Sequence, residues 1–339
     1  MTSTNSACPT DADTAAGGGG EQVVDVHAHF ITNRYIARAI NAGHREPDGM
    51  PENYWPRWSA DQHLRLMDEA GIAFSLLSLS SPGVHFGDDA AARALAREMN
   101  DVAAATAAEH PHRFGYFAVL PLPDTDGALA EIDRAFHRLG ARGVIVLTNN
   151  AGHYLGDRRL RPVLAELDRL GAVVLLHPTS CVGCENLAVG RPRPMIEFLF
   201  DTARTVVDFI LSGAAELYPR LRVIVPHAGG VLPLLVDRVE LFRSIHSEPD
   251  DRRTMDELLG TFHYDLAGTP SAPQLAALRS VVGQDHLLFG SDYAWTRHEQ
   301  VLRAIGILDR SLRPDGGQNW RRLTNCNAHR LLADGHQMG

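Results

Sequence analysis

The segment Val23-Val24-Asp25-Val26-His27-Ala28 is the first of eight short runs of apolar and β-branched residues along the chain. Glycine, proline or polar turns bound each run, and amphipathic, helix-like sequence separates it from the next. This alternation is typical of repeated βα units. The predicted strands are 23–28, 72–80, 114–120, 143–148, 172–177, 222–227, 262–267 and 286–291.

Eight such units favour closure of the strands into a (β/α)8 TIM barrel. A doubly wound open sheet is the alternative that the pattern leaves open. Two extra C-terminal helices are expected after the last strand, at 299–312 and 319–332. The helices expected between the strands are 59–70, 90–109, 124–139, 157–170, 232–244 and 271–282.

One domain accounts for the whole folded part of this 339-residue chain, because α/β barrels often exceed 250 residues. Residues 1–21 are small, polar and rich in glycine, with neither the basic start nor the apolar middle of a signal peptide. We therefore expect a disordered tail over 1–21 and a single domain over 22–339. The longest apolar runs fall far short of the roughly 20 residues that cross a bilayer, so no membrane association is expected.

The composition excludes several kinds of chemistry, because all 32 basic residues are arginine and the chain contains no lysine. A Schiff-base lysine, a pyridoxal phosphate anchor, a P-loop lysine and a carboxylated lysine bridging two metals are impossible. The net charge of -9 argues against nucleic acid and anionic membranes as partners, so a small-molecule ligand is expected. Four cysteines without a signal peptide favour the cytoplasm.

Polar residues at the ends of predicted strands indicate a metal site. His27 and His29 lie on one face of the first strand, because alternate residues of a strand point the same way. Imidazole nitrogen suits zinc and similar metals. His177 and His227 end the fifth and sixth strands, and Asp292 follows the last one. In a barrel these ends converge on one mouth, so the pattern predicts a site for a single metal ion there.

Five sequence stretches between about Val23 and Leu332 are distinctive: DVHAHF at 25–30, LLHPTS at 175–180, VPHAGG at 225–230, FGSDY at 289–293 and NAHRLL at 327–332. Together, and in this order, they resemble the amidohydrolase-related metal-dependent decarboxylases, typified by aminocarboxymuconate semialdehyde decarboxylase. The segment GRPRPMIEF, 190–198, is similar to the 6-methylsalicylate decarboxylase branch of that family.

The resemblance implies a division of roles at the site. His27, His29, His177 and Asp292 would be the ligands of one divalent metal per chain, zinc or, as in some members, manganese. His227 would be the catalytic histidine beside the metal, and Asp292 would deliver a proton to the substrate. The position of Asp25, two residues before His27, leaves two roles for it open: orientation of a ligand and polar packing in the core.

The resemblance also implies a small carboxylic acid substrate, with salicylate-type acids such as 6-methylsalicylate favoured. Arg238 would reach across a dimer interface to a neighbouring substrate carboxylate, which requires a homodimer or a higher oligomer. Side chains on the predicted rim would meet an aromatic acid. The candidate anion contacts are Arg57, Arg191 and Arg193, and the candidate ring contacts are Trp55, Trp58, Phe198 and Tyr293.

The implied reaction is a non-oxidative decarboxylation, and the sequence leaves two routes open. In one, Asp292, protonated at the metal edge, protonates the substrate on carbon and CO2 then leaves. In the other, that of the semialdehyde branch, His227 activates a metal-bound hydroxide that adds to the substrate. A hydrolase or hydratase is the alternative on the same scaffold, with His227 and a metal-activated water. A metal-loaded binding protein without catalysis is a third possibility, which the presence of both His227 and Asp292 disfavours. Cys181 and Cys184 are expected to form a reduced loop near the mouth rather than a redox or zinc site.

Overall fold

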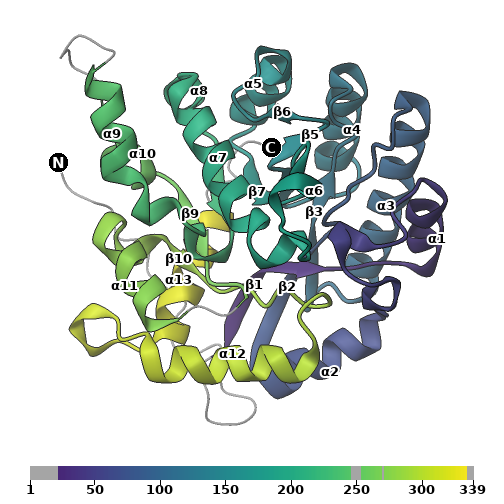
Figure 1. Ribbon diagram of the computed structural model, residues 1–339. Helices are drawn as coiled ribbons and strands as arrows, with labels where there is room; N and C mark the ends of the chain where they lie inside the picture. The colour runs from purple at the N-terminus through teal and green to yellow at the C-terminus, as the bar shows by residue number, and fades with distance from the viewer. Residues whose placement is uncertain (1–21, 246–252, 269–270, 334–339) are drawn as a thin grey trace.

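A computed structural model describes residues 22–245, 253–268 and 271–333 of the chain. Its main sheet has eight parallel strands in the order β1-β2-β3-β4-β7-β8-β9-β10 (Figure 1). The predicted tail over 1–21 lies outside the described residues. The strands are β1 (Val23–His29), β2 (Ile72–Ser78), β3 (Phe114–Val119), β4 (Gly143–Leu147), β7 (Val173–His177), β8 (Arg222–Val225), β9 (His263–Asp265) and β10 (Leu287–Leu288).

Backbone contacts between the first strand and the end of the last one close the sheet. Asp25 and Phe289 form a parallel bridge. The Val26 N–H donates to the Phe289 carbonyl at 3.0 Å, and the Asp292 N–H donates to the His27 carbonyl at 2.8 Å. An open, doubly wound sheet has no such closing contact, so the predicted TIM barrel is confirmed.

Helices surround the barrel, and α13 packs against β1 and β10 beneath the closing seam (Figure 1). Both expected C-terminal helices are present, as α12 and α13. None of the described helices has an apolar stretch long enough to traverse a bilayer. The helices are α1 (Asn33–Asn41), α2 (Ala60–Ala70), α3 (Asp89–Glu109), α4 (Thr125–His137), α5 (Arg161–Arg169), α6 (Cys184–Leu187), α7 (Glu197–Leu211), α8 (Ala214–Leu217), α9 (Val236–Ile245), α10 (Met255–Leu259), α11 (Ala272–Val281), α12 (His298–Ser311) and α13 (Trp320–Ala333).

Capping side chains set where several of these helices begin. Ser59, Asp88 and Asp124 each accept a hydrogen bond from a backbone N–H in the first turn of the helix that follows. The predicted segments 157–170 and 232–244 instead begin with a short 3-10 turn before α5 and α9. A small antiparallel pair, β5 (Asn149–Asn150) and β6 (His153–Tyr154), was not predicted, because two-residue strands carry no periodic signal.

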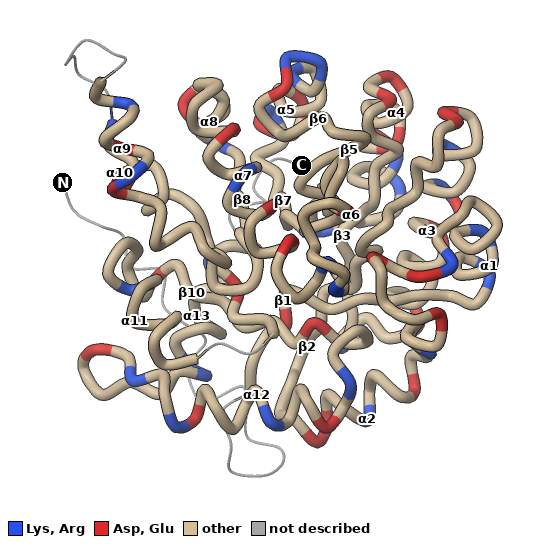
Figure 2. Tube along the Cα trace, in the orientation of Figure 1, with Lys and Arg blue, Asp and Glu red and all other residues tan. Residues whose placement is uncertain are grey.

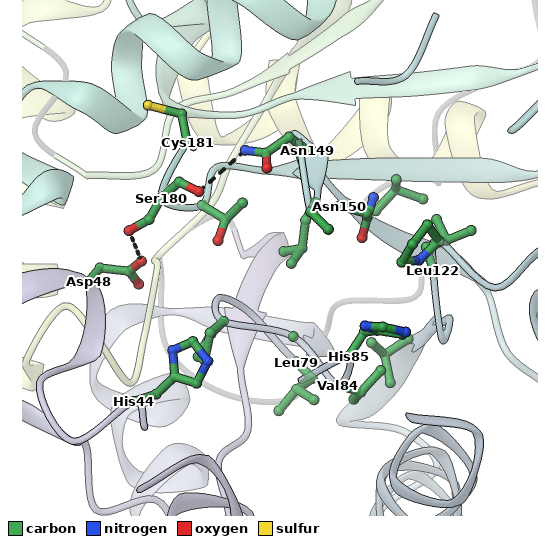
Figure 3. A pocket seen from close by; sticks show the side chains of 18 of the residues that line it. His44, Asp48, Leu79, Val84, His85, Leu122, Asn149, Asn150, Ser180 and Cys181 are labelled. Atoms are coloured by element: carbon green, nitrogen blue, oxygen red, sulfur yellow. Dashed lines mark hydrogen bonds between the residues drawn. The ribbon is translucent and has the colours of Figure 1, made fainter. Parts of the chain in front are cut away.

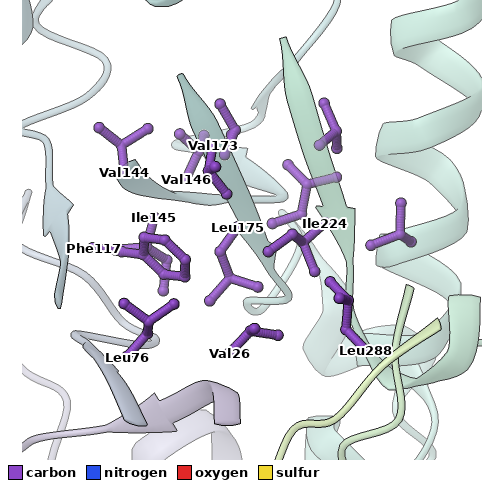
Figure 4. Packing of buried hydrophobic residues seen from close by; sticks show 14 of the residues in the cluster. Val26, Leu76, Phe117, Val144, Ile145, Val146, Val173, Leu175, Ile224 and Leu288 are labelled. Carbon is purple, nitrogen blue, oxygen red and sulfur yellow. The ribbon is translucent and has the colours of Figure 1, made fainter. Parts of the chain in front are cut away.

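Apolar side chains fill the inside of the barrel below the mouth. Figure 4 shows Val26, Leu76, Phe117, Leu175 and Ile224 together, each from a different strand and each at most 1% exposed. Most arginines and carboxylates lie on the surrounding helices (Figure 2). Burial of apolar surface is favourable by about 25 cal/mol per Å². The packed side chains therefore hold the strands together, and with them the strand ends that carry the polar residues.

Gly143, at the start of β4, tests how tightly the barrel is packed. A Cβ at this position would lie 2.4 Å from the backbone carbonyl oxygen of Val173. We expect Gly143→Ala to lower the free energy of unfolding by about 1–3 kcal/mol in urea titrations, because backbone cannot yield easily. Gly306→Ala in α12 is the control: its Cβ would meet the flexible end of Arg310 at 3.4 Å, and alanine favours the helix by about 0.5–1 kcal/mol. Equal stability of the two variants would contradict this packing.

Candidate metal centre

Four side chains from three strands of the barrel converge at its mouth. One ligand atom each from His27, His29, His177 and Asp292 can be chosen so that all four atoms lie within 4.8 Å of one another. The two β1 histidines share a face, His177 ends β7, and Asp292 follows β10. The structure thus brings together the four residues that the sequence singled out.

The distances within this cluster are short. The Nε2 atoms of His27 and His29 are 3.1 Å apart, and the His29 Nε2 lies 3.2 Å from the Asp292 Oδ1. The ring centroids of His27, His29 and His177 are between 4.8 and 5.3 Å apart. All three imidazoles are buried.

The outer nitrogen of each imidazole faces an acceptor, which fixes the tautomer. The His27 Nδ1 lies 2.8 Å from the Asp265 Oδ2, the His29 Nδ1 3.3 Å from the Ser78 carbonyl oxygen, and the His177 Nδ1 2.7 Å from the Pro178 carbonyl oxygen. With a proton on each Nδ1, the Nε2 atoms of the three imidazoles face the centre of the cluster. The 3.1 Å separation of the His27 and His29 Nε2 atoms requires a proton or a cation between them. The donor set therefore fits one divalent ion such as zinc.

Asp265, the last residue of β9, supports the cluster and was missed by the sequence analysis. Besides the His27 ring, this carboxylate accepts the backbone N–H groups of His227 and Ala267, both at 3.0 Å. Burial acts to lower the pKa of His27, but the Asp265 carboxylate outweighs it and raises that pKa to about 9. The sequence carries no signal for it, because Asp265 lies inside the predicted strand 262–267 and not at its end.

Asp25 supports backbone rather than a ligand side chain. Its carboxylate accepts the backbone N–H of His27 at 3.1 Å and that of Ser291 at 3.0 Å. Burial raises the pKa of Asp25 to about 6. One of these N–H groups belongs to His27 on β1, and the other belongs to the residue before Asp292 in the loop after β10. Asp25 therefore joins the two sides of the site across the closing seam.

His227 stands beside the cluster with its Nε2 4.0 Å from the Asp292 Oδ2. Both residues have left-handed backbone, with φ of 56° in each case, a conformation that costs energy outside glycine and is common at functional sites. The Gln274 amide donates to the His227 carbonyl at 2.9 Å. Burial lowers the pKa of His227, so that its imidazole is neutral at neutral pH.

A cavity of about 360 Å³, here called the metal cavity, opens onto the cluster at His177, His227 and Asp292. Its volume is within the range of small-molecule sites. No arginine is among the described residues that line it. Its apolar walls include Met50, Phe198, Leu199 and Trp295, and its polar lining includes Asp48, Ser80, Gln274 and Thr296.

The predicted ring contacts divide into two groups. Phe198 lines the metal cavity, with its ring centroid 6.4 Å from that of His177. Trp58 and Tyr293 do not line it: their rings pack against His63, at centroid distances of 6.4 and 4.8 Å. Trp55 does not line it either and packs behind Trp295, with the two ring centroids 5.5 Å apart. The prediction of these three as ring contacts is wrong for this cavity, since Tyr293 turns away where Asp292 turns in. Trp295, which the sequence analysis did not select, takes that place.

The predicted arginine contacts also lie away from the metal cavity of their own chain. Arg193 lines a neighbouring cavity, whereas Arg57 and Arg191 are exposed outside the metal cavity. Arg238 is exposed on α9, with its guanidinium carbon 4.7 Å from the ring centroid of Phe242. The contribution of Arg238 to a partner subunit stays a prediction.

Two thiols lie near the mouth, one in the loop before α6 and one at the first residue of α6. Cys181 and Cys184 are both free and both buried. Burial raises the pKa of the Cys181 thiol to about 11, and the neighbouring Cys184 adds to this shift. A protonated thiol is a poor nucleophile and metal ligand, which agrees with the expectation of a reduced, inert loop.

A closed (β/α)8 barrel with such a cluster at its mouth has the architecture of a metal-dependent barrel enzyme. Residues 24–333 match the Amidohydrolase family model, and the chain belongs to that family. It is 33% identical over 292 residues to 6-methylsalicylic acid decarboxylase of Penicillium expansum, covering 84% of this chain and 89% of that protein. The corresponding enzyme of Aspergillus aculeatus is 34% identical over 306 residues, covering 86% and 91%. The crystal structure of 2,6-dihydroxybenzoate decarboxylase complexed with 2,6-dihydroxybenzoate gives a TM-score of 0.79 at 27% identity, covering 93% and 100%.

Asp265→Asn tests the support of the cluster from β9. We expect a loss of metal affinity of about 10–100-fold, measured by competition with a chromogenic chelator, because the His27 ring loses its anionic acceptor. Asp285→Asn removes the same charge from a side chain that is 68% exposed and serves as the control. Unchanged affinity in Asp265→Asn would show that β9 does not hold the ligands.

Proposed function

We propose that this protein is a metal-dependent, non-oxidative decarboxylase of a salicylate-type aromatic acid, with 6-methylsalicylate the favoured substrate. The observation that carries the proposal is the metal cavity itself, which sets apolar walls directly above the cluster of three histidines and Asp292. The family relatives that are named as 6-methylsalicylic acid decarboxylases support this choice of substrate.

We propose one divalent ion per chain, held by His27, His29, His177 and Asp292, with zinc favoured over manganese. When bound, such an ion attracts the carboxylate and the ortho oxygen of the substrate and stabilises their negative charge. The lining supports this role. No arginine is among the described residues of the cavity, so the positive charge for an anionic substrate would come from the ion.

The residues of the chain supply positioning and proton transfer. Phe198 and Trp295 give the ring an apolar surface from which water is excluded. Burial opposes the ionisation of Asp292, but the imidazoles of His29 and His27 outweigh it and lower the pKa of Asp292. The carboxylate is thus ionised at rest and can take the proton of the substrate hydroxyl once the positive charge of the bound ion has made that hydroxyl more acidic. Delivery of that proton to the ring carbon forms a C–H bond, the C–C bond then breaks to release CO2, and the phenolate oxygen that remains takes a proton from solvent.

Neutral His227 lies where it can orient the substrate and relay a proton, at 4.0 Å from the Asp292 Oδ2, which also accepts from the Thr296 hydroxyl at 3.1 Å. A hydrolase or hydratase would instead use His227 to take a proton from water. The two reactions differ in their products, which makes them separable by direct assay.

Product analysis tests the proposed reaction. We expect the metal-loaded enzyme to convert 6-methylsalicylate into equal amounts of CO2 and 3-methylphenol, with one deuterium on the vacated ring carbon when the solvent is D2O. 3-Hydroxybenzoate, which lacks the ortho hydroxyl, is the matched control and should not react. Turnover of esters or lactones without CO2 release from any ortho-hydroxybenzoate would favour the hydrolase instead.

Two histidine variants separate binding of the metal from catalysis. We expect His177→Ala to lose the metal, and His227→Ala to keep it while kcat falls by about 100-fold or more, as for a lost proton-transfer group. Metal content by mass spectrometry and kcat by phenol formation are the measurements. Full turnover by His227→Ala would remove that residue from the mechanism.

We also propose that the enzyme is a homodimer in the cytoplasm, with a second copy covering the surface around α9. Apart from Tyr54, every exposed large hydrophobic side chain that the structure describes lies between residues 182 and 245, including Leu234, Leu241 and Ile245. Exposed Arg238 lies within the same stretch, where a partner subunit could receive it. The cytoplasmic location rests on cysteine usage alone and stays a prediction.

The apolar surface around α9 gives a test of the dimer. We expect sedimentation analysis to find two chains per particle, and Leu241→Glu to shift the protein toward monomer because a buried carboxylate would lack a partner. The control is Ala94→Glu, at an exposed position of α3 outside this stretch. A wild-type monomer at micromolar concentration would contradict the proposal.

A further inference from the structure

A second cavity of about 380 Å³ lies at the barrel mouth beside the metal cavity, and we call it the side chamber (Figure 3). Asp48 lines both cavities. Two hydrogen bonds stand between them: Ser180 donates to Asp48 at 2.6 Å, and the hydroxyls of Ser81 and Thr179 are 2.7 Å apart. The proposed reaction does not use the side chamber, although its wall is shared with the metal cavity.

The side chamber combines an apolar floor with unsatisfied donors. Leu79, Val84 and Leu122 form part of the floor (Figure 3). Above them, the Asn150 Nδ2 and the Arg193 Nε are buried and have no hydrogen-bond partner among the described residues. A buried donor without an acceptor is costly and uncommon in proteins. The chamber is therefore suited to a ring-sized ligand that brings an acceptor oxygen.

The charges of the chamber disfavour an anion. Arg193 is the one arginine among its described lining residues, and the lining also includes the carboxylates of Asp48 and Glu46. Burial raises the pKa of Asp48, while the nearby Arg193 guanidinium acts against that rise. Burial lowers the pKa of His44, so that this lining imidazole is neutral at neutral pH. The lining thus carries one guanidinium and two carboxylates, in contrast to the metal cavity with its proposed cation.

We propose that the side chamber binds an uncharged phenol, the product class of the proposed decarboxylation, on which this inference rests. Loss of CO2 turns an anion suited to the metal cavity into a neutral ring, because a phenol with a pKa near 10 keeps its proton at pH 7. The phenol oxygen can accept from the Asn150 amide while the ring lies on the apolar floor. A product held there leaves the metal cavity open to the next substrate.

Binding of 3-methylphenol to the full-length protein tests this proposal, with and without metal. Calorimetric titration of the chelator-treated enzyme should detect 3-methylphenol, whereas 3-methylbenzoate, with the same ring and methyl group, should bind at least about tenfold more weakly. Asn150→Leu should weaken phenol binding by about tenfold, the upper end for one neutral hydrogen bond. Asn186→Leu, at an exposed position of α6 outside the chamber, should not change it. Arg193→Met is the second variant if Asn150→Leu does not fold.

The outcomes separate this inference from the proposed function. Phenol binding to metal-free protein that depends on Asn150 supports the chamber, even if no acid tested releases CO2. Decarboxylation without such binding overturns the chamber and leaves the proposed reaction intact. Three other results would each contradict phenol binding in the side chamber. They are phenol binding that needs the metal, a preference for 3-methylbenzoate in metal-free protein, and equal affinities of wild type, Asn150→Leu and Arg193→Met.

Discussion

The convergence of three imidazole nitrogens and one carboxylate at the barrel mouth is the constraint on which the site depends. The outer ring nitrogen of each ligand imidazole faces an acceptor on the barrel, in His27, His29 and His177 alike. The other nitrogen, Nε2, therefore points to the centre of the mouth. A single proton can relieve one pair of these nitrogens, whereas a divalent ion relieves all three and also satisfies Asp292. The fold therefore fixes these side chains in an arrangement that is unfavourable without the ion. Binding of the ion makes that arrangement favourable.

Closure of the barrel makes this arrangement possible. The backbone bonds between β1 and the segment after β10 bring Asp292 next to His27, although the two lie far apart in the sequence. Asp25 accepts N–H groups from both sides of that seam, and Asp265 joins β9 to His27 and to the backbone of His227. Each carboxylate thus couples a ligand to the strand that positions it, which explains why buried acidic groups gather below a site that binds a cation.

Residues whose direction follows from a strand were predictable from the sequence. Strand period and strand ends were enough to bring His27, His29, His177 and Asp292 together, and all eight strands lie where the apolar runs predicted them. Loop side chains were not predictable, because their direction depends on packing. Tyr293 turns back to His63, whereas Trp295, two residues later in the same loop, reaches the metal cavity. Arg193, in another loop, turns into the side chamber. Asp265 escaped notice because a single carboxylate within a short strand has no local pattern.

The position of the ion itself tests the central claim most directly. Anomalous diffraction from crystals of the zinc-reconstituted enzyme should give one peak per chain, about 2.0–2.2 Å from the Nε2 atoms of His27, His29 and His177 and from an oxygen of Asp292. A peak elsewhere, a second peak of equal height at the mouth, or three imidazoles that keep this arrangement at full zinc saturation without an ion among them would contradict the account.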